Sequence, residues 1–176
     1  MDKIRIATLD DADEIYNLMK EVYEHLEDKN LFVCDDLDYI ISQISGNGFA
    51  VVACDEEGKI IGSFIIRYPG DSPDNLGRDI GLSKEELEKV AHMESVIVHP
   101  DFRGQGLQSQ MLRFAENRIE KKAYLLATVS PYNPASCRSF EKNGYEHVMT
   151  KEKYGGLIRR IYKKTMEKEY SSDQSV

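Results

Sequence analysis

The sequence predicts a mixed α/β fold, in which helices flank a twisted, mostly antiparallel sheet of about seven strands. Short β-rich segments alternate along the chain with stretches whose apolar residues recur at helical spacing. Residues 49–54 and 59–68, joined by a turn over residues 55–58, predict a β-hairpin. The chain of 176 residues has the usual length of one domain with a sizeable core. We place this single domain at residues 1–166.

The composition disfavours several classes of partner. The formal net charge of −8 argues against nucleic acid and anionic membrane surfaces, and favours a cationic partner such as an amine. No apolar run approaches the roughly 20 residues that cross a bilayer, and the N-terminus lacks the apolar core of a signal peptide, so a cytoplasmic location is expected. Cys34, Cys54 and Cys137 are widely spaced and predict free thiols. No histidine pair has metal-ligand spacing, so no metal site is expected.

The first half of the chain carries a strand and two helices ahead of the hairpin. Residues 3–8 alternate polar and apolar side chains and predict the first strand. Apolar residues at helical spacing then predict helices at 11–25 and 36–45. The second of these helices is expected to end at the glycine-bearing segment 46–48.

The connection over residues 69–89 is unusually long for a compact domain. Proline, glycine, aspartate, serine and asparagine crowd its beginning, and a short helical run follows at 83–87. Ser83 and Glu86 have the spacing of a capping box there. Two interpretations stay open, a wall or lid of a substrate site and a solvated surface insertion.

The second half of the chain predicts further strands and helices in alternation, followed by a hairpin. The expected elements are a strand at 92–98, a helix at 106–121, a strand at 124–129, a helix at 133–143, and strands at 145–151 and 157–166. The polar tail at 167–176 is expected to be disordered.

The segment 94–108 consists of an apolar strand, a proline, a glycine-bearing turn and the start of a helix. The first N–H groups of a helix lack intrahelical partners and carry partial positive charge, so they attract phosphate oxygens. Gly104 and Gly106 would let the backbone approach a ligand closely, and Arg103 adds a fixed positive charge. The amides from Gly104 to Ser109 therefore form a candidate diphosphate cradle, with a plain tight turn as the alternative.

This segment resembles motif A of the GNAT family of N-acetyltransferases, which reads Arg or Gln, two residues, Gly, one residue, and Gly or Ala. Arg103 and Gly106 match that pattern, while Gln108 stands where the small residue is expected. A later stretch resembles motif B of the same family. Its matching residues are Asn133, Ser136, Phe140, Gly144 and Tyr145. The two motifs have the right order and separation, and the resemblance covers roughly residues 3–166.

The resemblance implies the fold of that family and acetyl-CoA as cosubstrate. The strand carrying Val96 and Val98 would splay from the strand at 125–129, and the pantetheine arm would enter the V-shaped gap like an extra strand. The residues implied for binding acetyl-CoA are Val96, Ile97, Val98, Arg103, Gly104, Gln105, Gly106, Leu107, Gln108, Ser109, Asn133, Ser136 and Phe140. Asn133 has an alternative role as the N-cap of its helix, directly before Pro134.

Acetyl transfer requires that the amine lose a proton, that the oxyanion be stabilised and that the thiolate be protonated. Glu94 is the candidate base, with burial expected to raise its pKa, and a strand-end surface role is the alternative. The family commonly has a tyrosine acid where this chain has Phe140, so Tyr132 or Tyr145 would replace it, or the thiolate would leave with only water's help. His99 is a second candidate base or a loop cap.

The sequence thus predicts an enzyme that moves the acetyl group of acetyl-CoA to a primary amine of an unidentified small-molecule or peptide acceptor by direct attack. Acidic residues indicate that this amine is cationic, namely Asp71, Asp74, Asp79 and Glu94. The alternative is a CoA-binding sensor that has lost catalysis, because Phe140 and Thr128 stand where some family members carry the acid and the base. The protein is expected to be a monomer or a homodimer.

Overall fold

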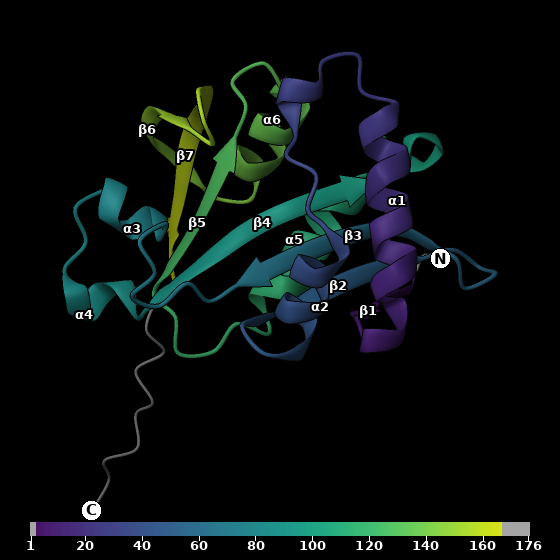
Figure 1. Cartoon of the computed structure of the whole chain (residues 1–176), viewed down its shortest axis with the longest axis horizontal. Helices are drawn as coiled ribbons and strands as arrows, with labels where there is room; N and C mark the ends of the chain where they lie inside the picture. The colour runs from purple at the N-terminus through teal and green to yellow at the C-terminus, as the bar shows by residue number, and fades with distance from the viewer. Residues whose placement is uncertain (1–2, 167–176) are drawn as a thin grey trace, which may run out of the picture.

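A computed structural model describes residues 3–166, and its strands form one sheet in the order β1-β2-β3-β4-β5-β7-β6 (Figure 1). The strands are β1 (Lys3–Ile6), β2 (Gly48–Cys54), β3 (Ile60–Arg67), β4 (Val90–Val98), β5 (Tyr124–Val129), β6 (Glu146–Lys153) and β7 (Leu157–Thr165). The helices are α1 (Ala12–Glu24), α2 (Leu37–Ser45), α3 (Leu76–Asp79), α4 (Lys84–Leu87), α5 (Leu107–Glu116) and α6 (Pro134–Lys142), with 3₁₀ turns η1 (Leu9–Asp11), η2 (Lys29–Leu31) and η3 (Pro100–Phe102). The tail predicted at 167–176 lies outside the described residues.

Neighbouring strands of the sheet run antiparallel except β4 and β5, which run parallel. The prediction of a mixed, mostly antiparallel sheet flanked by helices is therefore confirmed. Strand β7 lies between β5 and β6, so the C-terminal hairpin forms one edge of the sheet.

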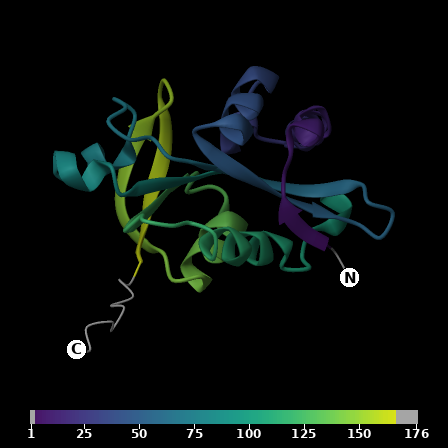
Figure 2. The ribbon, with the colours of Figure 1, turned by 90° about the horizontal axis from the view of Figure 1, so that it is seen from below.

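Helices cover both faces of the sheet. Helices α1 and α2 lie on one face, and α5 and α6 lie on the other (Figure 2). In β2, Ala50 and Val52 pack in the cluster with α1 and α2, whereas Val51 and Ala53 pack in the cluster with α5. All four are fully buried, which explains why this strand is a continuous apolar run. Within residues 3–166, no helix is both long and apolar enough to cross a membrane.

The connection between β3 and β4 is a packed part of the domain. Asn75 is 1% exposed, and its side chain accepts a hydrogen bond at the start of α3 while donating to two backbone carbonyls of the connection. Asp79 at the end of α3 forms ion pairs with Lys151 and Lys153 of β6. A buried polar cap and ion pairs therefore fix this segment to the domain, while residues 83–85 and 88–89 stay exposed at the surface.

Helix α5 ends at Glu116, earlier than the predicted 121. The N–H groups of Arg118 and Ile119 bond to carbonyls three residues back, so the chain tightens into a 3₁₀-like turn and leaves the helix. Lys121 then adopts a left-handed φ of 58°, which no helix continues through. The apolar spacing alone could not show this early end.

Candidate active site

Strands β4 and β5 enclose a gap in the sheet. They pair only at their beginnings, where Val90–His92 lies alongside Tyr124–Leu126. Beyond these residues β4 pairs with β3, and β5 pairs with β7. The two strands therefore separate toward their carboxyl ends, as the resemblance implied, and each presents a backbone edge to the gap.

A β-bulge in β4 turns two consecutive residues toward this gap. The register between β3 and β4 shifts between Phe64 and Ile66, so that Glu94 and Ser95 occupy the space of one residue of β3. A bulge bends its strand and redirects side chains, which are common features beside active sites. Both Glu94 and Ser95 line the cavity described next.

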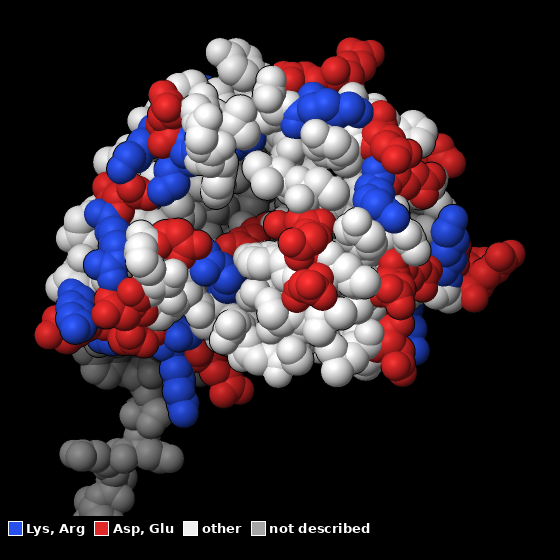
Figure 3. Space-filling view, viewed as in Figure 1, with Lys and Arg blue, Asp and Glu red and all other residues white. Residues whose placement is uncertain are grey.

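A cavity of about 520 Å³ fills the gap and extends toward the C-terminal hairpin. Its walls come from the loop after η2, from β4, β5 and the start of α6, and from the β6–β7 hairpin. Asp74 and Leu76 of the long connection also line it, so this connection forms part of the cavity wall. A hollow lies near the centre of the face in Figure 3, with acidic and basic side chains along its lower edge.

The predicted diphosphate cradle lies at the start of α5. Gly104 and Gly106 have left-handed φ angles of 79° and 74°, and a Cβ added at either would meet no atom within 4 Å. The N–H groups of residues 107–109 have no acceptor among the described residues. Arg103 donates from Nε to the carbonyl of Val98 at 3.4 Å, which holds the guanidinium close to the turn. Open amides, open space and a cation are what an anion requires.

Most of the predicted cosubstrate residues fall into two groups, and Ile97 and Val98 of β4 belong to neither. Val96 lines the cavity together with Asn133, Ser136 and Phe140, while residues 103–109 form the turn into α5. The side chain of Ile97 is 3% exposed and packs in the cluster with α1 and α2, so only its backbone can face the gap.

Helix α6 contributes both polar and apolar groups. Asn133 accepts from the N–H of Ser136 at 3.1 Å, which confirms its N-cap role, and its amide nitrogen has no acceptor among the described residues. Gln108 donates to the Ser136 hydroxyl at 3.4 Å, so this side chain turns toward α6. Phe140 is 2% exposed and packs edge-on against Tyr145, with ring centroids 5.0 Å apart. Phe140 thus provides an apolar wall where the resemblance expects an acid.

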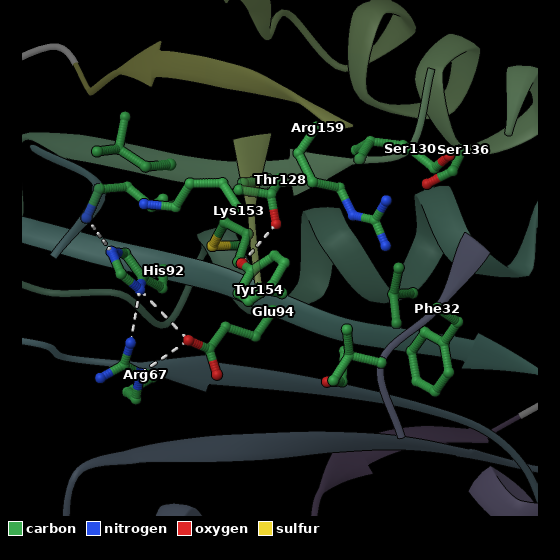
Figure 4. A pocket seen from close by; sticks show the side chains of 18 of the residues that line it. Phe32, Arg67, His92, Glu94, Thr128, Ser130, Ser136, Lys153, Tyr154 and Arg159 are labelled. Atoms are coloured by element: carbon green, nitrogen blue, oxygen red, sulfur yellow. Dashed lines mark hydrogen bonds and ion pairs between the residues drawn. The ribbon is translucent and has the colours of Figure 1, made fainter. Parts of the chain in front are cut away.

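Glu94 is the centre of a polar network at the bulge (Figure 4). One carboxylate oxygen accepts from Arg67 Nε at 2.7 Å and lies 3.3 Å from His92 Nδ1, and the other accepts from the Tyr39 hydroxyl. His92 is 2% exposed, and its Nε2 accepts the N–H of Leu76 at 3.0 Å. A neutral imidazole carries one proton, and because Nε2 accepts from Leu76, that proton lies on Nδ1. Nδ1 therefore donates to Glu94 and does not accept from Arg67 Nη2, which lies 3.0 Å away.

The expectation that burial raises the pKa of Glu94 is wrong. Burial by itself would raise it, but the hydrogen bond from His92, the charge of Arg67 and the hydrogen bond from Tyr39 together lower this pKa below its ordinary value. Burial lowers the pKa of His92, so the imidazole is neutral. Glu94 is therefore an ionised carboxylate at neutral pH, suited to attracting an ammonium group but a weak base.

Asp35, which the sequence analysis missed, lines the same cavity from the loop before α2. Its carboxylate accepts from the Ser95 hydroxyl. Burial raises the pKa of Asp35 from its ordinary 3.8 to about 6, against the effect of Ser95, and the nearby charge of Glu94 adds to the rise. A carboxyl group that titrates close to neutral pH suits proton transfer. Only the fold brings residue 35 to residue 95, so the sequence held no local signal.

Two tyrosines line the cavity, Tyr39 and Tyr154, and neither was predicted. Tyr154 follows β6 with a left-handed φ of 51°, which is uncommon outside glycine, and its hydroxyl lies 2.8 Å from Thr128 Oγ1 (Figure 4). Tyr132, the predicted acid, is 74% exposed and does not line the cavity. Tyr145 is buried against α5. Nothing in the residues around Tyr154 indicates a place in this cavity, because only the fold brings the β6–β7 hairpin to β5.

Other candidates from the sequence lie in structural roles. His99 accepts from the N–H of Asp101 at 3.2 Å, so the loop-cap interpretation is confirmed. Cys137 is 4% exposed within α6. Throughout the part of the chain that the structure describes, no group of three or more His, Cys, Asp or Glu side chains could hold a metal ion.

A splayed strand pair beside an open helix N-terminus is the architecture that the resemblance implied for an acetyltransferase. The sequence profile of the Acetyltransferase (GNAT) family matches residues 12–145, and the chain belongs to this family.

Individual proteins and solved structures that resemble this chain are also acetyltransferases by name. The S-alkylcysteine N-acetyltransferase of Bacillus subtilis (strain 168) is 21% identical over 170 residues, covering 92% of this chain and 88% of the relative. The structure of yncA, a putative acetyltransferase from Salmonella typhimurium with its cofactor acetyl-CoA, has a TM-score of 0.70 at 19% identity and covers 99% of both chains. The ribosomal-protein-S18-alanine N-acetyltransferase from Escherichia coli has a TM-score of 0.71 at 17% identity and covers 97% of this chain and 98% of that one.

Proposed function

We propose that this protein transfers the acetyl group of acetyl-CoA to a primary amine of a small molecule by direct attack. The observation that supports this most is the gap between β4 and β5, which opens beyond His92 and Leu126 and ends beside the open amides of α5. The extended pantetheine arm would pair with the free edge of β4, and the diphosphate would bind the amides of residues 104–109 with Arg103 alongside.

The chemistry divides among groups that line the cavity. The amine nitrogen attacks the thioester carbon, the C–S bond breaks and the thiolate of coenzyme A leaves. In our proposal Asp35 takes one proton from the bound ammonium group, which frees the nitrogen lone pair for attack. The second proton that the nitrogen loses after the attack balances the proton gained by the departing thiolate, and the free N–H groups of β4 stabilise the oxyanion. Glu94, ionised and held by three donors, attracts and orients the ammonium form of the acceptor.

Protonation of the thiolate falls to Tyr154 in this proposal, because its hydroxyl lies in the cavity beside Thr128. Tyr132 stays a second candidate, although, unlike Tyr154, it does not line the cavity. The relative from Bacillus subtilis is named for a small thioether amine, which supports a small-molecule acceptor here. No finding favours the alternative of an inactive sensor, and oligomeric state and cytoplasmic location stay predictions.

Calorimetric titration of acetyl-CoA into the wild type and into Gly106→Trp tests the proposal. We expect micromolar binding by the wild type and none by the variant, because an indole at residue 106 fills the space above the cradle. Gly58→Trp is the matched control, since Gly58 also has a left-handed φ, of 90°, and open space, but lies in the β2–β3 turn.

Each result has a distinct meaning. No binding by the wild type would refute the proposed function, and equal binding by both variants would refute the cradle. Binding without transfer to any primary amine would favour the sensor alternative.

A further inference from the structure

The cavity is lined by several charged side chains, and most of them are neutralised within the protein. Arg67 pairs with Glu94 at 2.7 Å and with Asp74 at 2.8 Å. Lys153 pairs with Asp79 at 2.6 Å. Each of these charges therefore has a partner of opposite sign before any substrate arrives.

Arg159 is a lining residue without such a partner. It is 4% exposed, and within residues 3–166 no carboxylate forms an ion pair with it. Its guanidinium donates to the carbonyls of Ile158 at 3.0 Å and Asn30 at 2.6 Å. Two carbonyl oxygens satisfy two of the five N–H donors but leave the positive charge without an ion-pair partner, and the more distant carboxylate of Asp28 offsets the cost of burial only in part. Burial accordingly lowers the pKa of Arg159.

The position of Arg159 directs this charge into the cavity. The side chain extends from β7 and lies between Tyr154 and Phe32 in Figure 4. Its carbon Cζ lies 5.9 Å from the centre of the Tyr154 ring. A planar guanidinium in an apolar surrounding binds a carboxylate through two parallel hydrogen bonds.

Asp35 is the complementary case in the same cavity. Its carboxylate accepts from Ser95, and no lysine or arginine of the described residues forms an ion pair with it. The charged groups around it are Glu94 on β4, Asp36 in its own loop and Arg67 on β3, and Arg67 is already engaged by Glu94 and Asp74. One negative and one positive charge in the same cavity thus lack internal partners.

We infer that the acceptor is a free amino acid, whose ammonium group faces Asp35 and Glu94 and whose carboxylate binds Arg159. This inference rests on the proposed acetyl transfer and names the substrate class of the same site. Leu31, Phe32 and Val33 line the cavity beside these groups, so the side chain of the amino acid is apolar. Binding a zwitterion compensates both unpaired charges at once, whereas a simple amine would leave Arg159 buried and unpaired.

A structural role for Arg159 is the competing explanation, because its bond to Asn30 ties β7 to the loop before α2. The test therefore compares acceptors and variants together. The acceptors are S-methyl-L-cysteine, its carboxamide, and the decarboxylated amine 2-(methylthio)ethylamine. The variants are Arg159→Gln, Arg159→Lys and, as matched control, Arg160→Gln, the adjacent arginine of β7 that does not line the cavity.

We expect the wild type to prefer S-methyl-L-cysteine over both carboxylate-free acceptors by about 10- to 100-fold in kcat/KM, as one charge-assisted pair provides. Arg159→Gln should abolish this preference, Arg159→Lys should retain part of it, and Arg160→Gln should keep it. Thermal melting and acetyl-CoA calorimetry on each variant verify that the fold and the cosubstrate site persist.

An equal loss of kcat/KM for all three acceptors in Arg159→Gln would overturn the inference and would indicate that Arg159 has only a structural role. A wild type that binds acetyl-CoA and prefers the carboxamide or the decarboxylated amine would also overturn it, while the proposed acetyl transfer would stand. A wild type that binds acetyl-CoA but acetylates none of the three acceptors would overturn the amino-acid assignment. A wild type that binds no acetyl-CoA would refute the proposed function itself.

Discussion

The proposed role of Asp35 makes a quantitative prediction for the pH dependence of the reaction. Asp35 must be ionised to accept a proton, and burial together with the charge of Glu94 places its pKa at about 6. Below that pH the ionised fraction falls about tenfold per unit, so kcat/KM should fall in proportion. Above it kcat/KM should level off, because the acceptor binds as the ammonium form until the amine itself titrates.

The assay is the initial rate of thiol release from acetyl-CoA between pH 5 and 9, at saturating acetyl-CoA and low acceptor. The wild type should show a break near the pKa of Asp35. Asp35→Asn can still accept the hydrogen bond from Ser95, so the loop should keep its position. The variant should lose about 10²- to 10⁴-fold in rate, and its remaining activity should follow the free-amine fraction without a break.

Asp38→Asn is the matched control, since Asp38 lies exposed on α2, close in sequence, and does not line the cavity. It should retain the profile of the wild type. A wild-type profile that rises steadily from pH 5 to 8 with the free amine, or an Asp35→Asn variant that keeps the break near pH 6, would refute Asp35 as the base.

Two further predictions concern Glu94 and Tyr154. Glu94→Gln removes the charge that faces Arg67 in a partly buried network, so urea unfolding should show a free energy of unfolding that is lower by about 1–3 kcal/mol. Asp74→Asn removes a largely exposed partner of Arg67 and should lower the free energy of unfolding by less than about 1 kcal/mol. Equal losses for the two variants would contradict the central place of Glu94 in the network. Tyr154→Phe should lower kcat by about 10²-fold or more with little change in acetyl-CoA affinity, and Tyr132→Phe should stay within about twofold; the reverse order would restore Tyr132 as the acid.

The fold and the proposed cosubstrate half of the site were predictable because their signals are local. Periodicity of apolar residues indicates each strand and helix, and the order strand, turn, helix around Gly104 and Gly106 places the open amides within a few residues. The N-cap role of Asn133 was likewise readable from the chain. Such features need no knowledge of which distant segments meet.

The proposed acceptor half of the site was not predictable, because it is assembled from remote segments. Asp35, Tyr154 and Arg159 come from a loop, a hairpin turn and the last strand, and nothing in their neighbouring residues indicates a shared cavity. No local sequence feature predicts the β-bulge at Glu94 either. The predicted direction of the pKa shift of Glu94 was wrong, because the sequence indicates burial but not the three donors that the fold assembles around the carboxylate.

The measurement that tests the account most directly is the balance of acetyl groups in one reaction. Purified protein is incubated with acetyl-CoA and a panel of primary amines that includes amino acids, their amides and peptides, and coenzyme A thiol and N-acetylated product are quantified by absorbance and mass spectrometry. Direct transfer to an amine predicts equimolar thiol and N-acetyl product with at least one amine, and an unchanged protein mass when acetyl-CoA is present alone. Thiol release without any N-acetylated amine, or a stable acetylated protein, would contradict direct transfer to an amine.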